Sequence, residues 1–173
     1  MNDVTPETLQ ARFPYMFPLE GEERRRAYTF FRGWLPPLAE ACEDVDALLG
    51  VDKRGFHWTR VREKLGSPRL AYLMEGKGRV AVNIHRPTEV HRFECAAAEG
   101  HDPVALAINE LVLQLEVKLR NLCIVGGAPS EINNDQGPWA SLCPEHRADT
   151  FEEGHRDWKC SIWKSASDWG LAK

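Results

Sequence analysis

The sequence has no long uninterrupted apolar run. Its most apolar stretch, residues 104 to 122, is broken by Asn109, Glu110, Gln114, Glu116, Lys118 and Arg120. A membrane-spanning helix needs about 20 predominantly apolar residues, so we expect none here. The chain opens with Met1-Asn2-Asp3, whereas a secretory signal starts with basic and then apolar residues. These absences predict a cytoplasmic protein.

Cysteines are few, and the common catalytic motifs are missing. Five cysteines without short regular spacings predict metal ligands, nucleophiles or core residues rather than disulfides. There is no P-loop, dinucleotide-binding turn or nucleophile elbow. His85 and His91 have no Asp or Glu at a spacing that would orient either ring. We therefore expect a protein that is not an enzyme.

What the sequence does contain is enough apolar material for a core, and an uneven distribution of charge. The 173 residues are 43% hydrophobic, and their net charge is −4. Residues 1 to 50 carry nine acidic and five basic side chains, whereas residues 51 to 95 carry five acidic and ten basic ones. A basic middle segment in an acidic chain can mark a surface for anionic partners.

Helix caps and apolar spacing predict an α+β fold. Expected helices are 6–12, 22–31, 36–49 and 103–122, and expected strands are 56–62, 69–74, 80–84 and 90–97. Thr5-Pro6 and Asp102-Pro103 are N-cap and first-turn pairs that begin the first and the longest helix. We expect a small antiparallel sheet of three to four strands, packed by the N-terminal helices and the longest helix. A last amphipathic helix is predicted around Trp158 to Trp169.

Cys123 and the Cys143-Pro-Glu-His146 sequence supply three ligands of a zinc knuckle. Structural zinc takes four tetrahedral ligands, commonly from C-x-x-C and C-x-x-H turns, and Gly126 stands where the second cysteine would be. His155, Cys160 or a water molecule could complete the site. Alternatively, the loop holds no metal, and Trp139 and hydrogen bonds maintain it.

Four sequence blocks follow one another along the chain: Arg12-Phe13-Pro14-Tyr15-Met16-Phe17, Gly33-Trp34, Val61 to Gly66 with Arg69 to Tyr72, and Cys123 to Pro129 with Trp139, Cys143 and His146. In this order they resemble a family of small uncharacterised proteins common in phages and bacterial mobile elements. The third block is similar to a Glu-Lys-Phe-Gly...Leu-Arg-Phe-Tyr signature, with Leu65 in place of phenylalanine. The resemblance implies an α+β body that ends in a zinc-ribbon-like knuckle. We divide the chain into a body (1–122), a knuckle (123–147) and a tryptophan-rich extension (148–173).

Two further groups of residues are candidates for binding. Arginines in the basic segment could bind nucleic acid together with exposed aromatic side chains, or an acidic partner, or could simply form a solvated sheet face. Tryptophans of the extension could pack on the body or anchor a partner. The candidate residues are Arg60, Arg62, Arg69, Arg79, Trp158, Trp163 and Trp169.

The hypothesis that follows is a non-catalytic accessory protein of a phage or mobile element. It would bind a host protein in the host cytoplasm and thereby inhibit a host process such as a defence system. A nucleic-acid-binding factor that uses the basic strand face is the first alternative. A zinc-dependent hydrolase built on the three ligands is the second.

Overall fold

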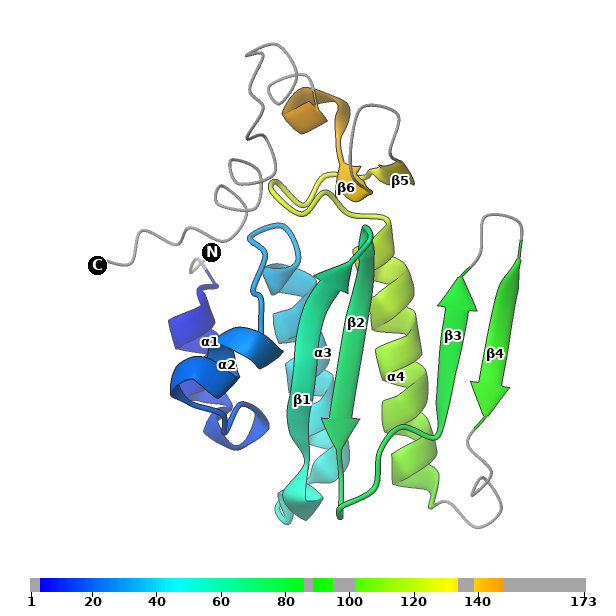
Figure 1. Ribbon diagram of the computed structural model, residues 1–173. Helices are drawn as coiled ribbons and strands as arrows, with labels where there is room; N and C mark the ends of the chain where they lie inside the picture. Colours follow the sequence, from blue (N-terminus) through cyan, green and yellow to red (C-terminus); the bar gives the residue numbers. More distant parts are fainter. Residues whose placement is uncertain (1–3, 86–88, 95–101, 134–138, 148–173) are drawn as a thin grey trace.

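A layer of helices backs two β-hairpins in the computed structural model, which describes residues 4–85, 89–94, 102–133 and 139–147 (Figure 1). The helices are α1 (Pro6–Arg12), α2 (Gly21–Ala27), α3 (Leu35–Leu49) and α4 (Pro103–Arg120), with short 3-10 turns at Pro14–Met16 and Lys53–Gly55. The strands are β1 (His57–Lys64), β2 (Ser67–Leu73), β3 (Ala81–His85), β4 (Val90–Glu94), β5 (Glu131–Asn133) and β6 (Ala140–Leu142). The predicted α+β class is confirmed.

The helices begin where the sequence predicts. The Thr5 hydroxyl accepts a hydrogen bond from the Thr8 amide, and Thr8 returns one to the amide of Thr5, so α1 starts with a reciprocal cap. At α4, the Asp102 carboxylate accepts a hydrogen bond from the Ala105 amide at 2.9 Å. Helix α2 ends at Ala27, four residues earlier than predicted. Tyr28 leaves the helix because its hydroxyl donates to the Trp58 carbonyl at 2.6 Å.

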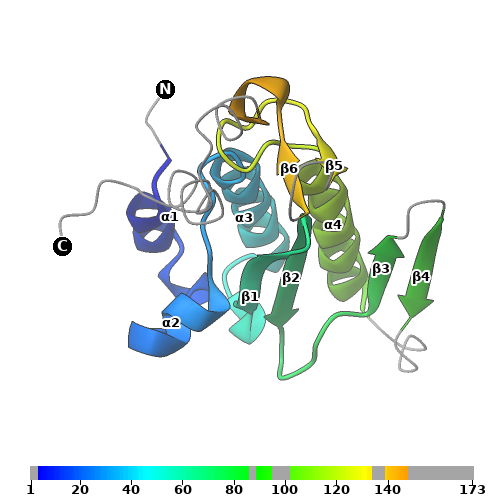
Figure 2. The ribbon, with the colours of Figure 1, turned by 45° about the horizontal axis from the view of Figure 1, so that its top comes forward.

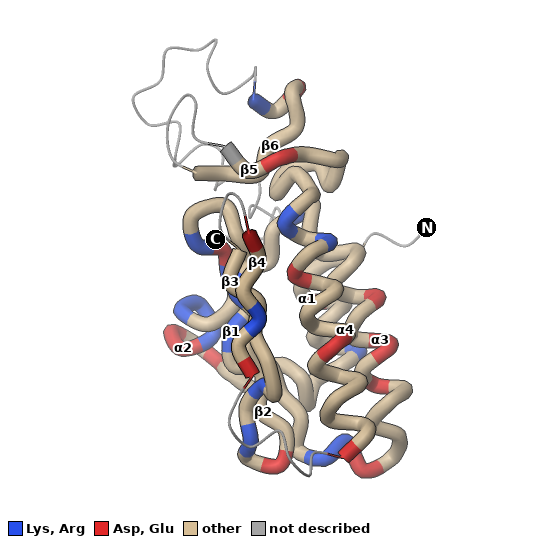
Figure 3. The backbone as a smooth tube through the Cα atoms, turned by 90° about the vertical axis from the view of Figure 1, so that its right-hand side faces the viewer, with Lys and Arg blue, Asp and Glu red and all other residues tan. Residues whose placement is uncertain are grey.

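The β1–β2 hairpin separates aromatic from basic side chains. Trp58 and Tyr72 are opposite each other in the antiparallel register and are buried against the helices. Arg62 is opposite Arg69, and both side chains lie on the outward face. Lys and Arg positions recur along the strand layer, which lies beside α3 and α4 (Figure 3). Alternation along the strands thus puts Trp58 and Tyr72 in the core and leaves Arg62 and Arg69 exposed.

The first four strands form two separate hairpins rather than one sheet. Strand β1 pairs with β2, and β3 pairs with β4, but β2 and β3 are not hydrogen-bonded to each other. Side chains of α4 take the place of that pairing. Asn109 accepts hydrogen bonds from the amides of Val80 and Ala81, at 3.1 and 3.0 Å.

Glu116, two turns after Asn109 on the same helix, occupies the edge of β2. Its carboxylate accepts hydrogen bonds from the two terminal guanidinium nitrogens of Arg79, at 2.6 and 3.0 Å, and from the Leu70 amide at 3.4 Å. Arg79 also donates to the Leu70 carbonyl at 3.0 Å. The backbone groups that a neighbouring strand would use are thus already bound, which explains why the two hairpins remain apart.

One apolar core joins α1, α3, α4 and the inner face of β1–β2, and it continues into the segment after α4. Cys42 is fully buried in it. Cys123, Ile124 and Leu142 belong to the same cluster of buried side chains. The knuckle therefore packs directly on the body. Within the described ranges, no helix has the length and apolarity that crossing a membrane requires.

Candidate metal centre

The segment after α4 folds into a tight turn that presents the Cys123 side chain. The Gly127 amide donates to the Cys123 carbonyl at 2.9 Å, and the Cys123 amide donates to the Ala128 carbonyl at 2.8 Å. Gly127 has a φ of +71°, a conformation that glycine adopts without strain. This turn lies beyond the C-terminal end of α4, next to β5 and β6 (Figures 1 and 2).

Cys143 and His146 come from one helical turn that follows β6. Residues 144–147 are helical, and the Arg147 amide donates to the Cys143 carbonyl at 2.9 Å. A separation of three residues puts the two side chains on the same side of that turn. The Nδ1 atom of His146 lies 3.1 Å from the Cys143 Sγ atom. The C-x-x-H spacing therefore produces the local geometry expected from the sequence.

The two turns bring Cys123, Cys143 and His146 together. Their ligand atoms all lie within 4.8 Å of one another, and the Cys123 Sγ atom is 3.6 Å from His146 Nδ1. Both cysteines are buried, and His146 is half-buried. Burial raises the pKa of the Cys143 thiol, backbone amides of His146 and Glu145 lower it, and the adjacent Cys123 thiol raises it further. A bound cation would reverse this preference because it stabilises the thiolate.

These three residues fit a zinc ion. Two thiolates and one imidazole are common zinc ligands, and Zn–S and Zn–N bonds of about 2.3 and 2.0 Å separate tetrahedral S and N ligands by about 3.5 Å. The sulfur–nitrogen distances of 3.1 and 3.6 Å are close to this value. No carboxylate belongs to the group in the described part of the chain. Such a ligand set is better suited to a soft metal than to Mg²⁺ or Ca²⁺.

Gly126 faces the position where a fourth ligand would be attached. A Cβ atom added to Gly126 would lie 2.7 Å from Cε1 of His146 and 3.3 Å from its Nδ1 atom. The backbone of Gly126 is not in the left-handed region, so its conformation would accept a cysteine. A side chain there would point at the ligand cluster. The imidazole of His146 therefore lies where the side chain of a C-x-x-C cysteine would begin, and the ring would have to shift to admit it.

Two residues that the sequence did not single out as site residues hold the turn against the body. Gly33, just before α3, donates its amide to the Ile124 carbonyl at 3.0 Å, and an added Cβ would lie 2.0 Å from the Cys123 carbonyl oxygen. Ser141, in β6, donates to the Arg120 carbonyl at the end of α4 at 3.1 Å. The sequence contained one signal, because Gly33 is part of the Gly33-Trp34 block.

The predicted basic group is only partly assembled. Arg60, Arg62 and Arg69 lie on the outward face of β1–β2, but Arg79 is buried in its ion pair with Glu116. Arg62 also donates to the Arg26 carbonyl at the end of α2, at 2.6 Å. Phe56 stacks on Tyr72 in the core, and Trp58 meets both rings edge-on, so this face has none of their rings for base stacking. His155, Cys160, Trp158, Trp163, Trp169 and the predicted last helix lie outside the described residues.

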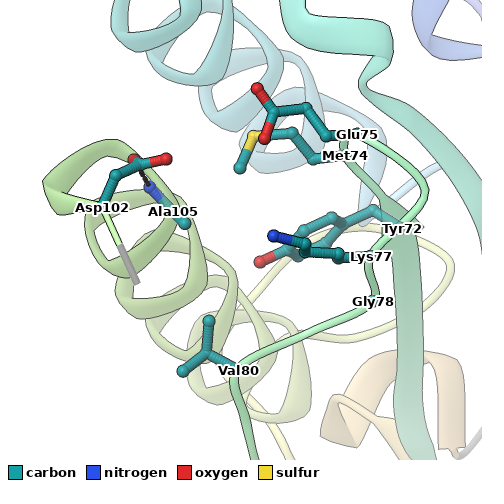
Figure 4. A pocket seen from close by; sticks show the side chains of 8 residues that line it. All are labelled: Tyr72, Met74, Glu75, Lys77, Gly78, Val80, Asp102 and Ala105. Carbon is teal, nitrogen blue, oxygen red and sulfur yellow. Dashed lines mark hydrogen bonds between the residues drawn. The ribbon is translucent and has the colours of Figure 1, made fainter. Parts of the chain in front are cut away.

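A pocket between the β2–β3 connection and the start of α4 offers no metal site. Tyr72, Lys77 and Val80 lie on one side of it, and Asp102 and Ala105 on the other (Figure 4). Arg54 neutralises the acidic side chains, since it binds Asp102 at 2.5 Å and Glu75 at 2.8 Å. Among the described residues, the Cys123, Cys143 and His146 cluster is the one group with metal-binding geometry.

Comparison with known proteins adds no further identification of this site. We compared the sequence and fold with protein-family models, with curated proteins and with solved structures, and found no match. The resemblance to phage and mobile-element proteins accordingly stays a prediction. The geometry of the cluster is the finding on which an account of function can rest.

Proposed function

We propose that this chain is a non-catalytic interaction protein in which a zinc ion, held by Cys123, Cys143 and His146, fixes the knuckle on the body. The convergence of the three ligands carries the zinc assignment. Bound zinc would supply structural cross-linking of two turns that are 20 residues apart in sequence, from Cys123 to Cys143. Cys123 would hold the end of α4, and Cys143 and His146 would hold the end of β6.

The burial of the ligands supports a structural role rather than a hydrolytic one. Cys123 is fully buried and Cys143 is 4% exposed, so the site lies against the core rather than at the base of a substrate cleft. A hydrolase also needs a base that activates the metal-bound water. The thiols and the imidazole of the cluster are the metal ligands themselves, and among the described residues no carboxylate joins them to act as such a base.

An exposed apolar face supports protein binding. In β3–β4, Val82 is opposite Phe93, and Ile84 lies on the same side of the hairpin two residues further on. Ile84 and Phe93 are 42% and 52% exposed. Arg92, on the other side, pairs with Glu110 of α4, so the face made by Val82, Ile84 and Phe93 points away from the helix. We call this group the hairpin face. An exposed aromatic among aliphatic side chains is typical of a protein contact.

The partner we propose is a protein of a bacterial host, such as a component of a defence system. The resemblance to proteins of phages and mobile elements motivates this choice, although it supplies no activity. Affinity capture from a host lysate tests this function. The full-length chain should retain one partner in stoichiometric amount, and Ile84→Ser/Phe93→Ser should lose it. Val51→Ser is the matched control, because Val51 is a fully exposed apolar residue outside the hairpin face. Failure to capture a partner, or equal capture by the double variant, would contradict the proposal.

A nucleic-acid-binding role has one observation in its favour, the shared outward face of Arg60, Arg62 and Arg69. It predicts binding that weakens steeply as salt concentration rises. Gel-shift assays at low salt with single- and double-stranded DNA and RNA check it. An unshifted probe in all four forms would eliminate this candidate.

A further inference from the structure

A cleft between β2 and β3, floored by the C-terminal half of α4, collects positive charge. Because β2 and β3 are unpaired, the cleft runs between their edges. Its lining includes basic or hydroxyl side chains from all three elements, Ser67, Arg69, His85 and Arg120. The carboxylate of Glu116 and the uncharged Pro68, Asn83 and Ile84 complete it. The three metal ligands are not part of this lining.

Glu116, the one carboxylate among the described lining residues, is already neutralised. Glu116 accepts two hydrogen bonds from the Arg79 guanidinium, at 2.6 and 3.0 Å, and the two side chains form a bidentate ion pair. The Arg79 and Glu116 side chains are only 7% and 12% exposed, so this pair is protected from competing water. Glu116 therefore has little charge left to balance a further cation.

Arg69 and Arg120 have no such partner within the described ranges. Neither forms an ion pair there, and Arg120 donates only to the Ser67 hydroxyl, at 2.9 Å. Burial lowers the pKa of Arg120, and the nearby Arg69 lowers it further. Arg69 is exposed at the rim of the cleft, and Arg120 is partly buried within it. Two guanidinium groups that line one cleft repel each other unless an anion lies between them.

His85 is the third nitrogen-containing basic side chain that lines the cleft. Its Nε2 atom is inaccessible to solvent and has no hydrogen-bond partner in the described part of the chain. Burial lowers the pKa of this imidazole, with smaller contributions from Arg120 and Arg69 in the same direction and an opposing one from Glu116. A buried polar atom without a partner is rare in folded proteins and indicates a missing ligand or water.

We propose that this cleft binds a phosphate group, with Arg69 and Arg120 as its charged ligands and Ser67 and His85 as additional hydrogen-bonding groups. Guanidinium groups match phosphate oxygens in a two-point geometry. Donors that approach from β2, β3 and α4 suit a tetrahedral oxyanion better than a planar carboxylate. The site is separate from the zinc cluster, whereas it shares Ile84 with the hairpin face. Phosphate binding can fail without any effect on zinc binding, because no metal ligand lines the cleft.

Titration of the full-length chain with inorganic phosphate, at constant ionic strength, tests the site. We expect saturable binding by calorimetry and a Tm increase of about 5–10 °C at a hundredfold excess over Kd. Arg69→Gln and Arg120→Gln should each weaken binding by about tenfold or more. Arg69 is exposed, so its variant should fold even if the Arg120 variant does not. Arg60→Gln is the matched control, since Arg60 lies on the same hairpin outside the cleft.

The outcomes are distinct. A Tm increase that does not saturate and persists in both cleft variants would be a bulk salt effect and would overturn the site, as would equal weakening by Arg60→Gln. An oligothymidylate without terminal phosphates then separates the sources of phosphate. Competition with inorganic phosphate would assign a phosphodiester backbone, and lack of competition would assign a free or terminal phosphate; either result supports the oxyanion site.

Discussion

The position of a Cβ atom on Gly126 is only 2.7 Å from Cε1 of His146. A side chain at Gly126 would therefore point into the ligand cluster, and the imidazole would have to move to admit it. The imidazole is the mobile end of a side chain, so this movement costs little compared with a backbone shift. In this chain the position of the absent cysteine thus lies directly against the His146 ligand.

Gly126→Cys should convert the three-ligand cluster into a four-ligand site. We expect zinc affinity to rise by roughly tenfold or more, equivalent to about 1.4 kcal/mol, because a fourth thiolate replaces a weaker ligand. Competition with a chromophoric chelator measures the change. Gly126→Ser is the control, since it adds a side chain of similar size with a poor zinc ligand. Equal affinities of the two variants would show that the position does not face the metal.

Gly33→Ala should loosen the knuckle without touching a ligand. The added methyl group would lie 2.0 Å from the Cys123 carbonyl oxygen and 2.5 Å from the Gly127 amide nitrogen, and both are backbone atoms. Overpacking of this kind costs about 1–3 kcal/mol, so Tm should fall by several degrees. Thermal unfolding measures the loss. Gly78→Ala is the comparison, because a Cβ there has open space, and a similar loss in both variants would refute the close packing.

Glu116→Gln should destabilise the fold strongly. It removes the anionic partner of Arg79, whose side chain is 7% exposed, and breaking a buried pair in this way costs about 3–5 kcal/mol. Chemical denaturation measures the free energy of unfolding. Glu110→Gln interrupts a half-exposed pair with Arg92 and should cost about 1 kcal/mol or less. Comparable losses would mean that the Arg79 and Glu116 pair does not stabilise the hairpin edges.

Asp102 should make stability depend on pH in the acid range. Its hydrogen bond from Arg54, and then that from the Ala105 amide, hold the pKa of the carboxyl well below its usual value. A carboxyl with a lowered folded-state pKa contributes stability above its unfolded pKa, about 3.9, and this contribution is lost as the pH falls through the folded pKa.

Asp102→Asn keeps a side chain that can cap α4 but removes the charge. Wild type should therefore be more stable than Asp102→Asn at pH 7, and the difference in Tm should shrink below about pH 4. Thermal unfolding between pH 7 and pH 2.5 checks this, with Asp44→Asn, a change on the exposed face of α3, as the control. A difference that is independent of pH would contradict the Arg54 pairing.

Local signals explain which parts of the fold could be predicted. Thr5 and Asp102 are caps that act within three residues, so the starts of α1 and α4 could be placed from sequence. The Cys143 and His146 spacing likewise works within one turn. The separation of the two hairpins could not be predicted, because it depends on Glu116 and Arg79, which are 37 residues apart. Pattern alone marked Arg79 as basic but could not indicate its burial.

The ligands of the candidate site could be predicted from sequence, but the residues that hold them in place could not. Cys123 and His146 were identified from spacing, whereas the close approach of Gly33 to Cys123 arises from the packing of α3 against the knuckle. A glycine has no side-chain chemistry that would mark it as part of a site. The phosphate cleft has the same origin, since Arg69 and Arg120 become neighbours only when α4 packs across the strand edges.

Zinc content of the purified full-length chain is the most direct test of the metal centre. Elemental analysis after gel filtration should give about one zinc ion per chain, and Cys143→Ser should lose it. Chelation should lower the Tm of the wild type to that of the variant, because the metal stabilises only the folded state. A wild-type chain that takes up no zinc, and whose Tm is unchanged by zinc or chelator, would contradict the account.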